Sequence, residues 1–312
     1  MIRRSVYVIV NPNAGGATAL GRLRILEQAL KNVNMPFHVD VTESRGHAVS
    51  LASRAVQDGV DYIVAFGGDG TLNEVLNGLL RQKAPRRRLP LLGFVGAGSS
   101  NDFIRSFGGG NGSFVQRLTA GVSVPINVGR IDCRDAQGLP VTRYFLVNAS
   151  LGIVARALEF FNRSAAIVRM MKRYSVDSAV LWSAINAIVR HESRKYGIVL
   201  DGTRTRKSVL TNLAILRGPN FGGGMSYGPR AKAPPGSFCV VGVGDLSKLE
   251  RIGTLSLFYR GSILSHPKVW LEKAKEIVIE SSERGIIEAD GELIGYLPAR
   301  FRITRRPVEM VY

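Results

Sequence analysis

Short apolar runs alternate with amphipathic segments over the first 125 residues of the chain. The apolar runs lie at residues 6–10, 37–41, 62–66 and 91–95. Between them, apolar residues recur every three or four positions at residues 21–32, 46–57 and 71–81. The runs predict strands and the recurrences predict helices, because these are the spacings at which each element brings side chains to one face. We expect residues 1–125 to form a Rossmann-like α/β nucleotide-binding domain with a parallel sheet.

The pattern changes beyond residue 125, where strand-like runs are separated by glycine and proline. These runs lie at residues 126–131, 143–149, 197–200, 210–216 and 237–243. A long helical pattern at about residues 152–191 interrupts them, and it is typical either of a core-packing helix with a basic face or of a lipid-facing lid. We expect a second, mainly antiparallel β domain over residues 126–299 that carries this helical insert. Residues from about 300 to 312 are a candidate for return to the first domain.

A glycine-rich turn, Gly67–Thr71, joins an expected strand to an expected helix. The first N–H groups of a helix have no partner within it, and the helix dipole is positive at that end. Glycines let a phosphate approach the backbone without meeting a Cβ atom. The turn therefore predicts a phosphate site.

The acid inside this turn, Asp69, needs its own explanation, because phosphate would repel an uncompensated carboxylate. It makes chemical sense if it holds Mg²⁺ or accepts a proton from an attacking hydroxyl. The structural alternative is a helix cap or an ordinary Asp-Gly turn. The strand, glycine turn and helix taken together favour the functional interpretation.

Composition places the chain among globular enzymes of about two domains, with 312 residues, 45% hydrophobic and 21% charged. The two cysteines, Cys133 and Cys239, are far apart and predict buried thiols in a reducing cytoplasm. The four histidines lack the spacing of zinc ligands. The longest apolar stretch, residues 179–189, is too short to span a bilayer.

The net charge of +18 predicts attraction to an acidic partner. Nucleic acid is not expected, because base-stacking aromatic residues and recognisable reading modules are missing from the basic segments. An anionic membrane surface suits the scattered basic residues better, so we expect a cytoplasmic protein that associates peripherally with membranes. A homodimer is left open.

Several motifs occur in a fixed order along almost the whole chain. They are residues 10–16 (VNPNAGG), 67–75 (GGDGTLNEV), 98–103 (GSSNDF), 148–152 (NASLG), the glycine-rich 222–229 and 289–292 (ADGE). This set resembles the diacylglycerol kinase catalytic-domain superfamily, which includes sphingosine kinases, ceramide kinases and soluble bacterial lipid kinases. The resemblance implies a two-domain, ATP-dependent lipid kinase that uses Mg²⁺ and has its active site in a cleft.

The same resemblance assigns roles to individual residues. The nucleotide would contact Asn11, Thr42, Gly67, Gly68, Asp69, Gly70, Thr71, Leu72, Asn73 and Ser99. Asp69 would serve the phosphates and their Mg²⁺, Asp102 would bind substrate, and Glu292 would be the general base on the hydroxyl of a lipid such as diacylglycerol or a sphingoid base. Taken alone, Asp290-Gly291 predicts only a hairpin turn.

The sequence departs from the family pattern in two places. Ser99 and Ser100 stand where a threonine and a small residue are usual, which keeps a hydroxyl for the nucleotide. Residues 231–238 (AKAPPGSF) replace a segment whose paired aspartates help to hold a structural Mg²⁺ in the bacterial lipid kinases. Prolines supply neither charge nor an N–H group, so we expect that second metal site to be absent or rebuilt.

Other functions remain in competition. NAD kinases share the Gly-Gly-Asp-Gly turn, so an NAD kinase or another small-molecule kinase is the rival among enzymes. A nucleotide- or lipid-binding protein that has lost activity is the rival outside them.

Two other motifs fail on inspection. Residues 16–23 lack the lysine of a Walker A loop. Residues 224–228 match a hydrolase nucleophile elbow but are followed by prolines rather than a helix.

Overall fold

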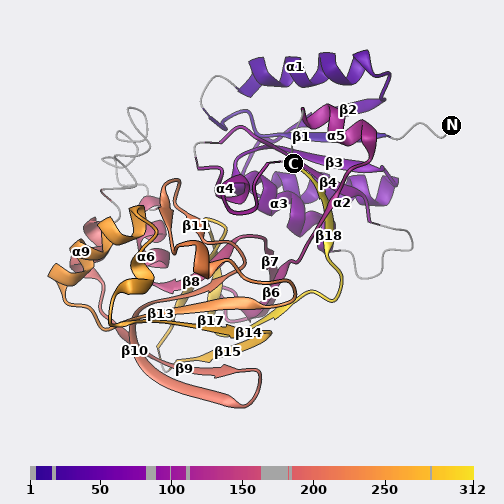
Figure 1. Cartoon of the computed structure of the whole chain (residues 1–312). Helices are drawn as coiled ribbons and strands as arrows, with labels where there is room; N and C mark the ends of the chain where they lie inside the picture. The colour runs from indigo at the N-terminus through magenta and orange to yellow at the C-terminus, as the bar shows by residue number, and fades with distance from the viewer. Residues whose placement is uncertain are drawn as a thin grey trace. The chain divides into compact units, whose positions relative to one another are not determined.

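The computed structural model describes residues 5–15, 19–81, 89–98, 100–109, 113–162, 182, 185–281 and 283–312. The chain forms two compact units (Figure 1). Unit 1 comprises Met1–Val128 and Arg305–Tyr312, and unit 2 comprises Gly129–Thr304. Unit 2 is therefore an insertion in the sequence of unit 1. None of the helices within the described ranges is long and apolar enough to cross a bilayer.

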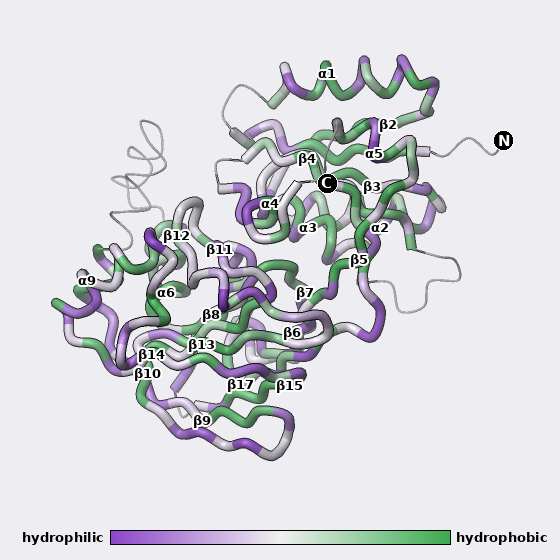
Figure 2. Tube along the Cα trace, viewed as in Figure 1, coloured by the Kyte–Doolittle hydropathy of each residue, from purple (hydrophilic) through white to green (hydrophobic). Residues whose placement is uncertain are grey.

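Unit 1 is an α/β unit built on one sheet. Its elements are β1 (Val6–Val10), α1 (Ala19–Asn32), β2 (Phe37–Val41), α2 (His47–Asp58), β3 (Tyr62–Gly67), α3 (Asp69–Leu80), β4 (Leu91–Gly96), α4 (Asp102–Phe107), α5 (Phe114–Ala120), β5 (Val124–Ile126) and β18 (Val308–Val311). The strand order is β2-β1-β3-β4-β18-β5, parallel from β2 to β18. The expected Rossmann-like sheet is confirmed. Every residue of β1 and β3 is buried, and both strands are mainly apolar (Figure 2), as expected when helices cover both faces of a sheet.

The last strand of the chain, β18, lies between β4 and β5. It runs parallel to β4, with Met310 opposite Leu92, and antiparallel to β5, with Val308 opposite Ile126. The single strand expected at residues 126–131 is wrong. The chain leaves the sheet of unit 1 after β5 and begins the sheet of unit 2 at Gly129, so the apolar run is shared between two sheets.

Unit 2 is mainly antiparallel β structure, as expected. Its elements are β6 (Gly129–Arg134), β7 (Pro140–Phe145), β8 (Asn148–Gly152), α6 (Ile153–Asn162), β9 (Arg194–Leu200), β10 (Arg204–Leu216), β11 (Asn220–Phe221), β12 (Met225–Ser226), η2 (Pro229–Ala231), β13 (Phe238–Gly244), α9 (Lys248–Tyr259), η3 (Ile263–Ser265), β14 (Val269–Ala274), β15 (Glu276–Glu280), β16 (Ile286–Ala289) and β17 (Glu292–Ile303). The large sheet follows the order β14-β13-β10-β8-β16-β17-β15-β9, with β6 and β7 added beside β17. Because β9 also pairs with β10, the path from β10 to β9 closes on itself.

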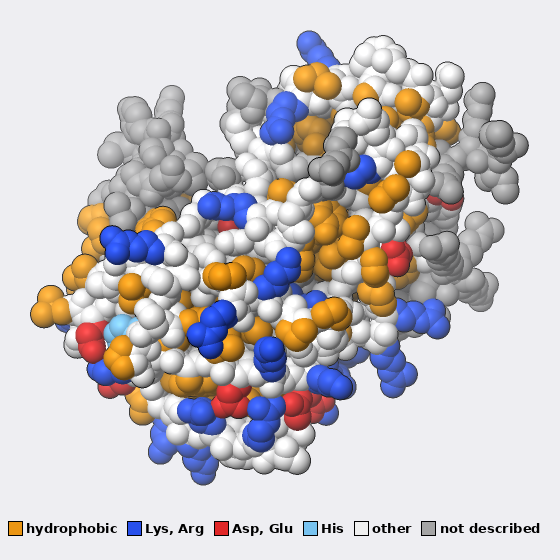
Figure 3. Space-filling view, in the orientation of Figure 1, with side chains coloured by type: hydrophobic (Ala, Val, Ile, Leu, Met, Phe, Trp, Pro, Cys, Tyr) orange, Lys and Arg blue, Asp and Glu red, His pale blue; other side chains and the backbone are white. Residues whose placement is uncertain are grey.

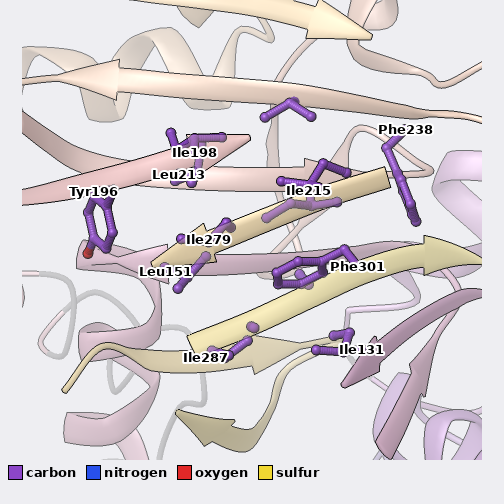
Figure 4. Packing of buried hydrophobic residues seen from close by; sticks show 14 of the residues in the cluster. Ile131, Leu151, Tyr196, Ile198, Leu213, Ile215, Phe238, Ile279, Ile287 and Phe301 are labelled. Carbon is purple, nitrogen blue, oxygen red and sulfur yellow. The ribbon is translucent and has the colours of Figure 1, made fainter. Parts of the chain in front are cut away.

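Alternate residues of the central strand β10 serve two different cores. Leu213 and Ile215 pack inside the sheet with aromatic and β-branched residues of the surrounding strands, the cluster drawn in Figure 4. Ala214 and Leu216 lie on the other face and pack with residues such as Phe258 of α9. Residues of a strand that is buried on both faces are mostly apolar, which is why the last four residues of β10, 213–216, show no alternation of apolar and polar positions.

The helical insert is described at its two ends. Helix α6 and a helix at residues 185–190 fall inside the expected range of 152–191, and Trp182 is also helical. Residues 163–181, 183 and 184 lie outside the described residues. A further helix, α9, was not expected from the sequence; it begins with a capping box in which Ser247 and Glu250 satisfy each other's backbone N–H groups.

Candidate active site

The glycine-rich turn of unit 1 connects the carboxyl end of β3 to the first residue of α3. Gly68 is the N-cap residue of α3, and it contributes no side-chain acceptor to the first N–H groups of the helix. Asp69 is the first helical residue. The backbone donors and the positive end of the helix dipole are therefore arranged as an anion site requires.

A second turn, which follows β4, crosses the first one at two glycines. A Cβ atom on Gly98 would lie 2.6 Å from Cα of Gly68, so the two backbones are in direct contact and Gly98 has no room for a side chain. The N–H group of Ala97 donates to the carbonyl oxygen of Gly67 over 2.7 Å. The two turns thus form one backbone-lined edge at the carboxyl ends of neighbouring parallel strands, where ligands of such sheets bind.

Asp69 caps α4 and not its own helix. Its Oδ2 accepts the N–H of Asp102 over 3.0 Å, and its Oδ1 accepts the N–H of Phe103 over 2.9 Å. The carboxylate thus lies at the N-terminus of α4 as well as in the first turn of α3, and the positive ends of both helices compensate its charge. The repulsion that an isolated acid would exert on phosphate is reduced in this way, while each oxygen keeps a second lone pair.

Two other predicted nucleotide contacts brace the same edge. Asn11 follows β1, and its side chain donates to Oγ1 of Thr71 over 3.2 Å while accepting the N–H of Asn13. The N–H of Thr42 donates to the carbonyl oxygen of Val10 over 2.8 Å, which places Thr42 at the end of β2. Asn11, Thr42 and the Gly67–Thr71 turn are therefore at one edge of the sheet.

Several predicted site residues are deeply buried. Leu72 is 2% exposed and Asn73 is 6% exposed, and the N–H of Leu72 already donates to the carbonyl oxygen of Gly68, so the side chains of both residues are shielded from solvent. Gly70 is half-buried in the first turn of α3, and Asp102 is buried at the start of α4. Ser99 lies outside the described residues.

The predicted base, Glu292, is the first residue of β17 and lies opposite Ala289 of β16. The two-residue turn between these strands is Asp290-Gly291, with φ values of 47° and 80°. Positive φ at both central residues is the property of a type I′ hairpin turn, which Asp-Gly favours. The expected hairpin is therefore present, and it fixes the backbone of the half-buried Glu292.

The carboxylate of Asp290 organises a distant part of the chain. It accepts the N–H groups of Leu146, Val147 and Asn148 over 2.7, 2.9 and 3.1 Å. These three N–H groups turn toward one acceptor, so the chain bends between β7 and β8. The single strand expected at residues 143–149 is wrong for this reason.

The sequence motifs did not predict a role for Glu288, a buried acid beside this turn. Glu288 of β16 is 3% exposed; it accepts the hydroxyl of Ser150 over 2.5 Å and the N–H of Gly291 over 3.3 Å. Burial, and next the negative charge of Glu288, raise the pKa of Tyr227. An acid within the otherwise apolar strand of residues 286–289 was the available sequence signal.

Comparison with known proteins places these two units in one family. The diacylglycerol kinase catalytic domain matches residues 5–131, and the YegS C-terminal NAD kinase beta sandwich-like domain matches residues 149–311. The second match alone covers more than half of the chain. The chain belongs to the family that joins a diacylglycerol kinase catalytic domain to a YegS C-terminal domain.

Relatives in this family align over the full chain. Diacylglycerol kinases of Staphylococcus carnosus and Staphylococcus haemolyticus are 27% and 29% identical to it over 99% of its length, covering 95% and 88% of their own. A structure assigned as a diacylglycerol kinase from Bacillus anthracis shares the fold, with a TM-score of 0.67, 21% identity and coverage of 100% of this chain and 98% of that one. Yeast NADH kinase has a TM-score of 0.51 at 10% identity, covering 99% of this chain and 83% of its own. Family membership makes this chain a kinase-type phosphotransferase that uses a nucleotide.

The kinase reaction implies a divalent cation, and the unit 1 site fits one. Mg²⁺ on a nucleotide is commonly held by one or two carboxylates together with the phosphates. Asp69 supplies a carboxylate with free lone pairs at the glycine edge. Across the described part of the chain there is no cluster of three or more acidic, histidine or cysteine side chains, so an all-protein metal cage is not formed there.

Proposed function

We propose that this kinase transfers the γ-phosphoryl group of ATP to a hydroxyl group of a membrane lipid, such as a diacylglycerol or a sphingoid base. The observation that carries the proposal is the crossing of Gly68 and Gly98 beside Asp69. It creates a backbone-lined anion site with one compensated acid, which suits a nucleoside triphosphate and its cation. The full-length match to diacylglycerol kinases supports a lipid acceptor.

Unit 1 would hold the nucleotide. The N–H groups of Gly70 and Thr71 would bind the phosphates, and Asn11 and Thr42 would bound the site at the ends of β1 and β2. Asp69 would hold Mg²⁺, which when bound neutralises charge on the phosphates. Asp102 would lie on the acceptor side of this site.

Unit 2 would supply the proton acceptor. Glu292 would take the proton from the lipid hydroxyl as that oxygen attacks the γ-phosphorus. Its backbone is held by the type I′ turn, by the three bonds of Asp290 and by the bond from Gly291 to Glu288. Such bracing is useful in a general base, because its efficiency depends on a fixed distance to the hydroxyl.

We place the reaction at an anionic membrane surface. The lipid acceptor resides in a bilayer, and a net charge of +18 attracts the protein to anionic headgroups. This attraction weakens with salt, since exposed charges are screened.

The test is transfer of labelled phosphate from ATP to a panel of diacylglycerol, sphingoid base and ceramide. Asp69→Asn and Glu292→Gln are each expected to lower the rate at least about 100-fold, the usual contribution of acid–base or charge-stabilising groups. Glu280→Gln, at the exposed end of β15, is the matched control and should leave the rate unchanged. Absence of transfer to every lipid, or normal rates in both site variants, would contradict the proposal.

A second acceptor is favoured by one specific finding. The sandwich-like domain of unit 2 is related in fold to NAD kinases, and yeast NADH kinase superposes over 99% of the chain. Including NAD in the acceptor panel separates the two functions. Phosphorylation of NAD with no lipid product would establish the small-molecule kinase, and nucleotide binding without any product would indicate a binding protein without activity.

A further inference from the structure

Two helices of unit 2 expose large apolar side chains. The two-helix patch consists of Trp182, Ile185 and Val189 at the 185–190 helix, and Leu249, Ile252 and Tyr259 on α9. Their exposed fractions run from 42% at Trp182 to 81% at Leu249. Ile185 and Val189 are four positions apart, and the α9 residues are separated by three and seven positions, so the exposed residues of each of these two helices share one face. Hydrophobic side chains gather over α9 at the edge of the surface in Figure 3.

A buried arginine ties the two helices together. Arg251 of α9 is 7% exposed, and its guanidinium donates to the carbonyl oxygens of Ile188 and His191 and to the hydroxyl of Ser193. It therefore caps the carboxyl end of the 185–190 helix from α9. The opposite side of α9 is anchored by Phe258 in the second apolar core of unit 2. The exposed faces are thus held on a fixed support.

Charge at the patch points to one kind of occupant. Lys248 and Arg260 are exposed at the two ends of α9, and Arg190 is exposed beside Val189. Of the nearby acids, Glu250 is paired with Lys268 over 2.8 Å, and Asp245 and Glu192 are exposed, so the three flanking cations outnumber these two exposed acids. Apolar residues flanked by lysine and arginine are the composition of helices that lie in an anionic bilayer interface.

We propose that the two-helix patch is the surface by which this protein inserts into an anionic bilayer. Single exposed apolar residues are ordinary, but six large ones on two helices that Arg251 joins exceed scattered exposure, and such groups mark interaction sites. This inference rests on the proposed lipid acceptor, because the bilayer that the patch enters would also contain the lipid substrate. A second copy of the chain is the alternative occupant.

Trp182 belongs to the patch, so its fluorescence can report whether the patch enters a bilayer. The chain has two tryptophans, and the other, Trp270, lies beneath the guanidinium of Arg206 at 4.4 Å on β14. In a Trp270→Phe protein, adding vesicles of phosphatidylglycerol and phosphatidylcholine should shift the emission of Trp182 to the blue. Lipids brominated in the acyl chain should quench it. Unchanged emission on vesicles that sediment with the protein would overturn the proposal.

Paired substitutions test the surface without touching the proposed catalytic residues. Leu249→Asp with Ile252→Asp should weaken vesicle binding at least tenfold. Leu139→Asp and Ile25→Asp are the matched controls, because these side chains are 62% and 72% exposed outside the patch. They should bind vesicles as the unaltered protein does. Equal binding by the double variant would contradict the proposal.

Activity separates this proposal from the proposed function. With a short-chain diacylglycerol below its micelle concentration, the double variant should phosphorylate as fast as the unaltered protein, and with diacylglycerol in vesicles it should be at least tenfold slower. If the unaltered protein phosphorylates neither form of diacylglycerol, the lipid kinase proposal fails. The fluorescence of Trp182 then still shows whether the patch enters a bilayer. If the double variant changes a dimer to a monomer in light scattering and vesicle binding is unaffected, the patch is an interface between copies.

An independent inference concerns the loop at residues 231–238, where the family resemblance implies a structural Mg²⁺. This loop contains no carboxylate. Arg217, which directly follows β10, is 4% exposed, and its guanidinium donates to the carbonyl oxygens of Pro234 and Ser237, the former over 2.8 Å. The N–H of Ala233 donates back to the carbonyl oxygen of Arg217 over 3.1 Å.

We infer that the guanidinium of Arg217 is a built-in cation that replaces a metal ion in this loop. The carbonyl oxygens that would bind a hard cation such as Mg²⁺ already accept hydrogen bonds from the guanidinium of Arg217. The positive charge of this guanidinium also repels a divalent ion. Burial without a carboxylate partner disfavours the charged form and lowers the pKa of Arg217, although arginine stays charged. The loop therefore needs no metal to hold its shape.

Thermal unfolding of the nucleotide-free protein tests the inference. Exchange of MgCl₂ for EDTA should move the midpoint of unit 2 by less than 1 °C, roughly the error of such a measurement, whereas Arg217→Met should lower it by about 5 °C or more. Arg230→Met, an exposed arginine on the same segment, is the matched control and should have no effect. A midpoint that rises saturably with Mg²⁺ in the unaltered protein would overturn the inference. So would an unaltered midpoint in Arg217→Met.

Discussion

The carboxylate of Asp69, in the first turn of α3, accepts the backbone N–H of Asp102, the first residue of α4. One side chain therefore joins the two glycine turns that line the proposed nucleotide site. The sequence posed a choice between a structural cap and a phosphate-serving acid. The structure permits both, because the cap uses one lone pair of each oxygen and leaves a second one for a ligand.

Removing this carboxylate should cost stability as well as nucleotide affinity. Asp69→Ala should lower the free energy of unfolding of unit 1 by about 1–2 kcal/mol, the usual cost of a lost helix cap. Hydrogen exchange of unit 1 amides measures it. Ser113→Ala is the matched control, because Ser113 caps α5 in the same unit. It should destabilise by about 1 kcal/mol and leave nucleotide affinity unchanged. If both variants lose nucleotide affinity equally, the role of Asp69 is that of a helix cap only.

The glycine crossing predicts an asymmetric response to added methyl groups. Gly98→Ala would place a Cβ atom 2.6 Å from Cα of Gly68, whereas Gly68→Ala would place one 3.4 Å from Cα of Gly98. The first should destabilise unit 1 by about 1–3 kcal/mol through overpacking, and the second by less. Urea unfolding and nucleotide titration of the two variants check this. A larger effect at Gly68 would show that the turn is shaped differently.

Asp290 should contribute more to the stability of unit 2 than Asp201, an exposed aspartate that also accepts backbone N–H groups. Asp290→Ala leaves three buried N–H groups without their acceptor, and we expect a loss of about 3 kcal/mol or more. Asp201 also has positive φ and accepts two N–H groups, from Lys275 and Glu276, but it is exposed. Water can replace it, so Asp201→Ala should cost about 1 kcal/mol. Chemical unfolding followed by the near-UV signal of unit 2 compares them.

A buried histidine should make unit 2 sensitive to mild acid. Burial, and next the positive charge of Arg251, lower the pKa of His191 to about 4 from its ordinary value of 6.5. The unfolded chain therefore binds a proton below pH 6.5 that the folded chain refuses, so stability falls as the pH drops from about 6.5 to 4. The total is at most about 3 kcal/mol at 1.36 kcal/mol per pKa unit.

His191→Gln should remove this part of the pH dependence. Carboxylates with lowered pKa values, such as Asp132, Asp201 and Glu250, lose their contribution mainly below about pH 5, so the range from about pH 5 to 6.5 isolates the contribution of His191. Unfolding midpoints measured between pH 4 and 7 provide the comparison. A slope that survives in the glutamine variant would assign the pH dependence to other groups.

The regular part of unit 1 could be predicted because its signals are local. The strands at 6–10 and 37–41 match the structure to the residue, and the helices differ from those observed by at most two residues at either end. Apolar runs and helical repeats are set by neighbours in sequence, which a single chain reveals.

The errors arise where distant residues decide the local structure. The run at 143–149 is apolar enough for one strand, and the acceptor that bends it, Asp290, follows about 140 residues later. The cap of α4 by Asp69, and the binding of the loop carbonyls by Arg217, are likewise contacts between segments far apart in sequence. Local propensity contains no information about them, so the candidate site could be located from its motifs but its internal bonds could not be foreseen.

The two connections between the units run as a pair. Ile126 lies opposite Val308 where the chain leaves unit 1, and Gly129 lies opposite Ile303 where it enters unit 2. An inserted unit whose ends are adjacent can be removed by a short turn joining residues 128 and 305, with β18 still in its place between β4 and β5. We therefore expect unit 1, the proposed nucleotide-binding half, to fold as a single small protein onto which other second units can be grafted at the same junction.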